Sequence, residues 1–202
     1  MFHQNSDLEG LAEDIVASNA DFVTLQELSQ DNGPLLLNLK ETYPYQLICR
    51  SKKVRGGTAV LSRVKPLENG VCTRDYASAR LTVDLGERVG PIHVTSVHLS
   101  WPYPREQPRQ LRDLLRDLEA LDYPVIIGGD FNMVPWSHAL SSVAQASGTR
   151  RLGPAQATFQ LGFVPLSIDH VFAPYRGLVQ TRPRLGSDHL GLRAVVNMAN
   201  PN

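Results

Sequence analysis

Apolar residues recur along the chain in short runs that are rich in β-branched side chains and are bounded by glycine, proline or polar residues. Runs of this kind are typical of strands. Eight are expected, at residues 21–27, 45–49, 58–62, 80–85, 92–99, 124–129, 169–174 and 190–198. Since no repeat or linker interrupts them, the pattern predicts one domain over residues 1–202, an α/β architecture of two sheets packed face to face with helices outside.

Helical spacing of apolar residues predicts four helices, one before the first of these strands and three between later ones. The clearest lies at 105–121, where five leucines share one face. Others are expected near 34–42 and 136–146. The first helix is expected to begin almost at the start of the chain, because Ser6 followed by Glu9 matches a capping box.

Composition narrows the function classes only modestly. The 202 residues are 42% hydrophobic, enough for a full core, and 20 basic residues balance 20 acidic ones. The resulting net charge of zero gives no general attraction to nucleic acid or to an anionic membrane, although a local basic groove is compatible with it. No run reaches the roughly 18 apolar residues of a membrane helix. We therefore expect a soluble chain, cytoplasmic, or extracytoplasmic if a membrane segment lies upstream.

The two cysteines, Cys49 and Cys72, are isolated in the sequence. Their spacing matches no metal motif, which argues against a zinc ribbon and against a disulfide scaffold. We expect both to be packing residues, and they leave the redox compartment undecided.

Polar side chains gather at strand ends, where a layered fold brings distant residues to one edge. Taken singly, each has a structural explanation, such as a solvated carboxylate, a hydrogen-bonded core histidine or a turn residue. Taken together, carboxylates, an amide and histidines without cysteine favour a hard cation such as Mg²⁺ beside a phosphate over zinc. The five clusters are Gln26-Glu27, His98, Asp130-Phe131-Asn132, Asp169-His170 and Ser187-Asp188-His189.

Six short motifs follow one another along the chain: LQE (25–27), GGTAVLSR (56–63), VHL (97–99), GGDFN (128–132), IDHV (168–171) and GSDH (186–189). Their order resembles that of the endonuclease/exonuclease/phosphatase superfamily, the DNase I-like metal-dependent phosphoesterases. The stretch GGDFNMVPWSHAL resembles a bacterial branch of that superfamily, some members of which carry membrane segments ahead of the domain. The resemblance covers essentially the whole chain and implies a four-layered α/β sandwich of two mixed sheets with helices outside.

The resemblance also implies roles for the matching residues in hydrolysis of a phosphoester by an activated water. Glu27 would hold the divalent cation, Mg²⁺ or Mn²⁺, and Asp188 would be a further metal contact. Asp130 would orient or deprotonate the attacking water. Asn132 would hydrogen-bond the phosphoryl oxygen or the nucleophile.

Two histidines complete the implied machinery. His189 would bind the phosphate or take part in proton transfer. Asp169 would fix which nitrogen of the His189 ring carries the proton. His98 would donate a hydrogen bond to a non-bridging oxygen. In-line attack builds charge on the equatorial oxygens, so donors aimed at those oxygens stabilise the transition state.

The substrate is less well defined by the sequence than the chemistry. Arg80 and Arg109 are candidate phosphate contacts, although Arg109 with Asp113 is also an ordinary i,i+4 pair on a solvated helix face. Trp101 could stack on a base or sugar, or could cover the sheet edge. A phosphodiester is favoured, either nucleic acid or a lipid or small-molecule phosphodiester, acted on by a monomer with no obligate protein partner.

Two alternatives remain open at this stage. One is a catalytically impaired binding module of the same fold. The other is a phosphomonoesterase acting on sugar, inositol or lipid phosphates.

The start of the chain departs from the superfamily pattern. In that pattern a core strand ending in a metal-contacting asparagine precedes the first helix, and the register places that asparagine before Met1. The resemblance therefore implies an N-terminally truncated domain whose first core strand is missing. Asn5 lies beside the helix cap, and we expect it to be a turn residue rather than a replacement.

Overall fold

The computed structural model describes residues 5–50, 56–103 and 106–198. Its helices are α1 (Leu8–Ala17), α2 (Gly33–Asn38), α3 (Gln107–Glu119) and α4 (His138–Ala146). Its first strands are β1 (Phe22–Leu25), β2 (Tyr45–Cys49), β3 (Thr58–Ser62), β4 (Val71–Cys72), β5 (Ser78–Asp84), β6 (Pro91–His98) and β7 (Val125–Asp130). The others are β8 (Arg150–Arg151), β9 (Phe159–Leu161), β10 (Val164–Leu166), β11 (Asp169–Ala173), β12 (Gly177–Arg182) and β13 (Gly191–Val196).

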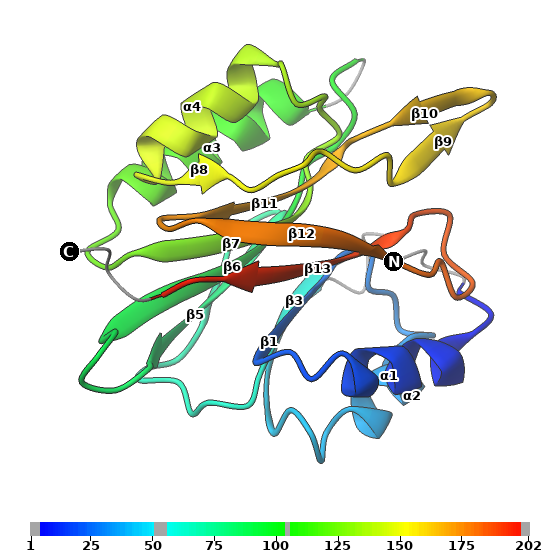
Figure 1. Cartoon of the computed structure of the whole chain (residues 1–202), viewed down its shortest axis with the longest axis horizontal. Coiled ribbons are helices and arrows are strands. Elements are labelled where there is room, and N and C mark those ends of the chain that lie inside the picture. The colour runs from blue at the N-terminus through cyan, green and yellow to red at the C-terminus, as the bar shows by residue number, and fades with distance from the viewer. Residues whose placement is uncertain (1–4, 51–55, 104–105, 199–202) are drawn as a thin grey trace.

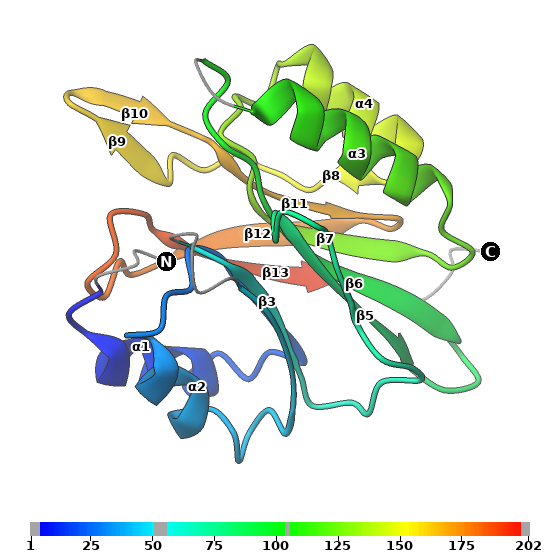
Figure 2. The same cartoon turned by 180° about the vertical axis from the view of Figure 1, so that it is seen from behind.

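All strands except the two-stranded hairpin β9-β10 form two layers that pack face to face. One layer is a six-stranded sheet in the order β4-β5-β6-β7-β11-β8, in which β6 and β7 run parallel and the other pairs are antiparallel. The second layer contains the three-stranded sheet β1-β3-β2 and the two-stranded sheet β12-β13. Helices α3 and α4 cover the outer face of the large sheet, and α1 and α2 cover the outer face of β1-β3-β2 (Figures 1 and 2). The predicted four-layered sandwich is therefore confirmed.

Side-chain alternation explains why β6 reads as an almost continuous apolar run. Ile92 and Val94 point into the space between the sheets, where they pack with residues of β2, β3 and β5. Val97 points the opposite way, toward Leu114 and Leu118 of α3. The strand is thus buried on both faces, and its inner face ends at His98.

The first helix begins one residue later than the capping box predicted. The Asp7 side chain accepts a hydrogen bond from the Gly10 N–H at 3.0 Å, whereas Ser6 is exposed. Asn5 Oδ1 accepts from the Asp7 N–H at 2.7 Å, so a turn precedes the helix and places the Asp7 carboxylate next to the Gly10 amide, which has no partner within the helix.

The prediction that the cysteines are unpaired is wrong. Cys49 and Cys72 form a disulfide with their Cα atoms 5.5 Å apart. Cys49 ends β2 in the smaller sheet and Cys72 ends β4 at the edge of the large sheet. The bond therefore ties together two sheet edges that come close only in the folded chain, which explains why their spacing carried no local signal.

Several short elements were not predicted from the hydrophobic pattern. They are β4, β8, β12 and the hairpin β9-β10, which are exposed on much of their surface. Helix α3 begins at Gln107, and the predicted start at Arg105 lies outside the described residues. Within the described parts of the chain, no helix is long and apolar enough to cross a membrane.

Candidate active site

Strand register brings three of the predicted residues to one end of the inner face of the large sheet. The parallel pairing of β6 and β7 sets His98 opposite Asp130, and the antiparallel pairing of β7 and β11 sets Asp130 opposite Asp169. Gly129 permits this close approach, because a Cβ there would lie 1.9 Å from the Val97 carbonyl oxygen. The three side chains share a face because directly paired residues on neighbouring strands point to the same side of a sheet.

His189 joins this row from the loop that precedes β13. Its Nδ1 donates a hydrogen bond to Asp169 Oδ2 at 2.8 Å, the contact expected from the sequence. Because the carboxylate can only accept, Nδ1 carries the proton and Nε2 faces the site. The buried Thr158 hydroxyl donates to the same carboxylate oxygen, so Asp169 is held from both sides.

Asp130 and Asn132 form a second fixed unit. Asp130 Oδ1 accepts from the Asn132 N–H at 2.8 Å, and Asp130 Oδ2 accepts from Asn132 Nδ2 at 3.2 Å. Asn132 Nδ2 also donates to the Leu99 carbonyl at 2.8 Å. Asn132 Oδ1 is buried and has no hydrogen-bond partner among the described residues. A buried acceptor of this kind is suited to receive a donor from a ligand or water.

Glu27 reaches the same place from the smaller sheet. It follows β1, and its Oε1 lies 3.9 Å from His98 Nε2, which in turn lies 4.0 Å from Asp130 Oδ2. Glu27 has a φ of 59°, and Asn132 has a φ of 51°. Non-glycine residues rarely occupy this left-handed region, and residues held there cluster at functional sites.

Burial and charge give the titratable groups different protonation states. Burial lowers the pKa of His98 to about 4, so its imidazole is neutral near pH 7. Burial and the Asp169 charge raise the pKa of Asp130 to about 8. Burial alone would lower the pKa of His189, but the hydrogen bond and charge of Asp169 outweigh burial and raise the pKa. Pairs of groups whose pKa values are pushed apart are typical of acid/base sites.

The donor set fits a divalent cation. Ligand atoms of Asp130, Asp169 and His189 lie within 4.8 Å of one another, and Glu27 adds a further carboxylate beside His98. Without a cation the buried Asp130 carboxyl resists ionisation, and a nearby positive charge would reverse that tendency. Asp169 and His189 already hydrogen-bond to each other. Asp130 and Glu27 are therefore the carboxylates best placed to hold a hard cation.

The other predicted site residues lie outside this group. Asp188 is exposed and does not belong to the carboxylate cluster. Arg80 pairs with Thr95 on the outer face of the large sheet, opposite the face that carries His98. Arg109 forms ion pairs with Asp75, Glu106 and Asp113. These three predictions are not supported by proximity to the catalytic groups.

Trp101 lies near the site, with the ring of Phe159 between it and His189. Its ring centroid lies 6.0 Å from that of Phe159, whose centroid lies 4.7 Å from the His189 imidazole. The aromatic pair thus forms a wall beside His189. Thr158 and Phe159 were both missed by sequence reasoning, because Thr158 lies in the loop before the short strand β9, which begins at Phe159, and no motif surrounds them.

A row of catalytic-type carboxylates and histidines at the edge of a four-layered sandwich defines the class of metal-dependent phosphoester hydrolases. The family model of the Endonuclease/Exonuclease/phosphatase family matches residues 1–189. The chain belongs to this family. No curated protein matches the sequence significantly.

Solved structures show the same fold at low sequence identity. An endonuclease/exonuclease/phosphatase family protein from Leptotrichia buccalis is 16% identical, with a TM-score of 0.73 over 95% of this chain and 92% of that one. D. rerio TDP2, complexed with a single-strand DNA product, is 19% identical, with a TM-score of 0.68 over 92% and 89%. A beta toxin mutant from Staphylococcus aureus with bound magnesium ions is 16% identical, with a TM-score of 0.68 over 96% and 94%.

Proposed function

We propose that this protein is a divalent-metal-dependent phosphodiesterase of the endonuclease-like type, with Mg²⁺ or Mn²⁺ as its cofactor. The observation that carries the proposal is the convergence of the Asp169–His189 pair, the Asp130–Asn132 unit and the His98–Glu27 contact at one end of the inner face. Family membership supports phosphoester hydrolysis in general. The magnesium-bound beta toxin mutant supports the choice of metal.

The chain's own residues account for most of the required chemistry. Glu27 and Asp130 would hold the cation, which would neutralise phosphate charge when bound. His189 carries a proton on Nδ1 that Asp169 fixes, so its Nε2 is oriented to donate to, or exchange a proton with, a phosphate oxygen or the attacking water. Asp130 accepts from Asn132 and is placed to orient the attacking water.

His98 has a different task because it stays uncharged. With its pKa at about 4, it acts near pH 7 as a neutral hydrogen-bond donor to a non-bridging oxygen rather than as an acid. Removing a single donor of this kind typically costs about 10²–10³ in rate. Asp188 remains a proposed outer contact to the metal.

The aromatic side chains of Trp101 and Phe159 beside His189 narrow the range of substrates that the site suits. Trp101 and Phe159 offer ring faces next to the phosphate position, which suits a phosphodiester that carries a base or another flat or apolar group. The D. rerio relative in complex with a DNA product supports nucleic acid as one such substrate. With a net charge of zero, tight binding to long duplex DNA is not favoured over a short or small phosphodiester.

Two chromogenic esters test this proposal against its alternatives. Hydrolysis of bis(p-nitrophenyl) phosphate with Mg²⁺ or Mn²⁺, abolished by EDTA, is the expected result. Preferential hydrolysis of p-nitrophenyl phosphate would instead indicate the phosphomonoesterase. Absence of turnover of either ester with either metal would indicate the binding module.

A further inference from the structure

The inner face of the large sheet changes from apolar to small and polar side chains toward its catalytic end. On β6 the inward residues run from Val94, in the apolar core between the layers, to Ser96 and then to His98. On β7 Gly128 precedes Asp130 on the same face, and Ser96 is directly paired with Gly128. A row of small residues therefore lies between the apolar core and the catalytic groups.

Strand β1 of the smaller layer meets the large sheet at this row. A Cβ on Gly128 would lie 2.9 Å from Thr24 Oγ1, so glycine permits the close approach of the two layers. The Ser96 hydroxyl donates to the Leu25 carbonyl at 3.0 Å and accepts from Gln26 Nε2 at 3.0 Å. We call these contacts of Ser96 and Gly128 with Thr24, Leu25 and Gln26 the inter-sheet seam.

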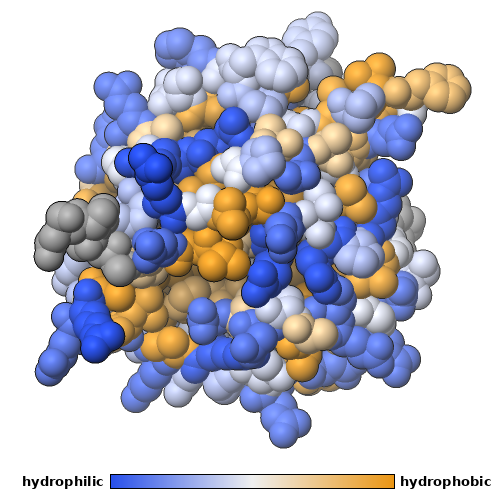
Figure 3. Space-filling view, in the orientation of Figure 1, coloured by the Kyte–Doolittle hydropathy of each residue, from blue (hydrophilic) through white to orange (hydrophobic). Residues whose placement is uncertain are grey.

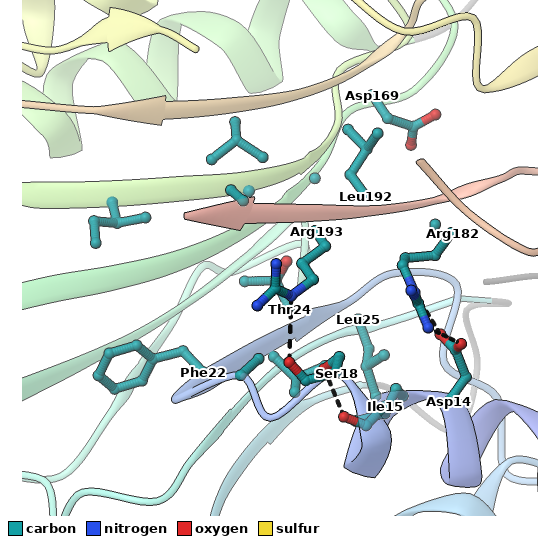
Figure 4. Close-up of a pocket in the computed structure, with 18 of the residues that line it drawn as sticks. Asp14, Ile15, Ser18, Phe22, Thr24, Leu25, Asp169, Arg182, Leu192 and Arg193 are labelled. Atoms are coloured by element: carbon teal, nitrogen blue, oxygen red, sulfur yellow. Dashed lines mark hydrogen bonds and ion pairs between the residues drawn. The ribbon is translucent and has the colours of Figure 1, made fainter. Parts of the chain in front are cut away.

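A cavity of about 450 Å³ lies beside the seam, and Thr24, Gln26 and Gly128 are among its lining residues. Figure 3 shows it as a hollow with apolar residues at its centre and hydrophilic residues around it, and Figure 4 shows Phe22, Thr24 and Leu25 of β1 among the side chains that line it. The space between the layers is thus partly open next to β1. The seam ties the end of β1 directly to the large sheet across this space.

Ser96 is suited to hold the two layers together because it is fully buried and its hydroxyl is fully used. The single hydroxyl proton goes to the Leu25 carbonyl, which leaves the oxygen free to accept from Gln26. Both partners lie within two residues of Glu27, and Ser96 lies two residues before His98. The two hydrogen bonds therefore act on the backbone that leads directly to groups of the site.

We propose that Ser96 is a positioning residue that fixes Glu27 of the smaller layer relative to Asp130 of the large sheet. Asp130 is placed by the strand pairing of β7 with β6 and β11. Glu27 follows the end of β1, so its distance from the large sheet depends on the seam. These are the two carboxylates assigned to the cation, and the inference therefore rests on the proposed function.

Loss of the Ser96 hydroxyl is expected to weaken cation binding more than it slows the reaction. Mg²⁺ demands near-ideal geometry with oxygen ligands at about 2.0–2.1 Å, so a small displacement of one carboxylate weakens binding. Changes to groups that orient metal ligands typically reduce affinity by about 10–100-fold. The Asp169–His189 hydrogen bond includes no residue of the seam, so the step that it serves should persist once the site is saturated with metal.

Ser62 provides a matched control on the strand next to β1. It is also fully buried, and its hydroxyl donates to the Val64 carbonyl at 2.7 Å and accepts from the Val64 N–H at 3.0 Å. It lies opposite Phe22, at the end of β1 that is remote from Glu27. Ser62→Ala therefore removes the same type of group without altering the seam.

The test compares the wild type with Ser96→Ala, Gln26→Met and Ser62→Ala. Isothermal titration calorimetry measures Mg²⁺ binding to the substrate-free proteins, and turnover of bis(p-nitrophenyl) phosphate is measured over a range of Mg²⁺ concentrations. Melting temperatures in EDTA report the stability of each fold separately. Gln26→Met keeps the length of the side chain and removes one of the two hydrogen bonds, so it tests the seam even if Ser96→Ala does not fold.

Ser96→Ala is expected to raise the Kd for Mg²⁺ by about tenfold or more, and Gln26→Met should raise it by a smaller factor. In both variants kcat at saturating Mg²⁺ should stay within about threefold of the wild-type value. Ser62→Ala should lower the melting temperature and leave the Kd for Mg²⁺ unchanged.

Two results would overturn this inference and leave the proposed function standing. One is an unchanged Kd for Mg²⁺ in both Ser96→Ala and Gln26→Met while the wild type binds Mg²⁺ and hydrolyses the ester. The other is an equal rise of the Kd in Ser62→Ala, which would show that general loosening of the fold is the cause. A wild type that neither binds Mg²⁺ nor hydrolyses the ester would instead overturn the proposed function, and this inference with it.

Discussion

His189 Nδ1 donates to Asp169 Oδ2 at 2.8 Å, and the Thr158 hydroxyl holds the same oxygen. The carboxylate thus sets which imidazole nitrogen faces the site and keeps the ring basic. We expect Asp169→Asn to lower kcat by about 10²–10³ with little change in KM, because orientation for proton transfer is lost while binding groups remain.

The protein contains a matched control for this variant. His93 Nε2 lies 3.1 Å from Asp122 Oδ1, a second histidine–carboxylate pair on the outer face of the large sheet. Asp122→Asn should leave steady-state turnover of bis(p-nitrophenyl) phosphate near the wild-type value. Equal losses in both variants would mean that the Asp169 effect is not local to the site.

We expect Glu27 to lower the stability of the folded protein, although metal-dependent turnover requires it. Its φ of 59° is unfavourable for a residue with a Cβ, by about 1 kcal/mol, and glycine would relieve that cost. Glu27→Gly should therefore raise the melting temperature by about 2–4 °C, while Glu27→Gly and Glu27→Gln both lose most metal-dependent turnover.

Asn19→Gly is the control for the backbone effect, since Asn19 also has a positive φ, of 51°, and was not placed in the site. It should retain full activity. Full metal-dependent turnover by Glu27→Gly, measured over a range of Mg²⁺ concentrations, would show that Glu27 does not bind the cation.

Asp130 makes the stability of the metal-free protein depend on pH. Its pKa is raised from 3.8 to about 8, so the folded state binds this proton more tightly than the unfolded state does. Its contribution to the free energy of unfolding is therefore present at low pH and is lost as pH rises from about 4 to about 8.

Melting temperatures in EDTA between pH 5 and pH 8 measure this effect. Asp130→Asn should flatten the decline, because asparagine does not titrate. Mg²⁺ should restore part of the wild-type stability at pH 8, because it binds the folded state and favours the ionised carboxylate. A variant with the same pH slope as the wild type would show that Asp130 is not the group responsible.

The Cys49–Cys72 disulfide should contribute measurably to stability. It closes a loop with a sequence separation of 23, for which the chain-entropy model predicts about 3 kcal/mol. Paired Cys49→Ser and Cys72→Ser substitutions should lower the melting temperature by about 6–12 °C. A fall of less than about 2 °C would show that the two sheet edges are held without the bond.

Several features of the fold were predictable because they depend on local side-chain patterns. Hydrophobic runs located the buried strands of the large sheet. His98, Asp130 and Asp169 converge because β6 and β7 end, and β11 begins, at the same edge of that sheet. The amphipathic pattern likewise located α3, whose leucines pack on that sheet.

Features that depend on contacts between distant segments were not predictable in the same way. The disulfide joins the edges of two different sheets, and Thr158 contacts Asp169 from the loop before β9, where the sequence carries no motif. Arg109 shows the reverse case: its position in a basic stripe suggested phosphate binding, whereas nearby carboxylates pair with it. The helix cap moved from Ser6 to Asp7 because Asn5 forms a turn that the capping pattern does not describe.

The measurement that tests the proposed function most directly is Mg²⁺-dependent hydrolysis of bis(p-nitrophenyl) phosphate by the wild type and by His189→Ala, with His138→Ala as a control at an exposed histidine. The expected result is EDTA-sensitive turnover by the wild type and His138→Ala, and a loss of about 10²-fold or more in His189→Ala. Equal turnover by all three proteins, or wild-type turnover that persists in EDTA, would contradict the proposal.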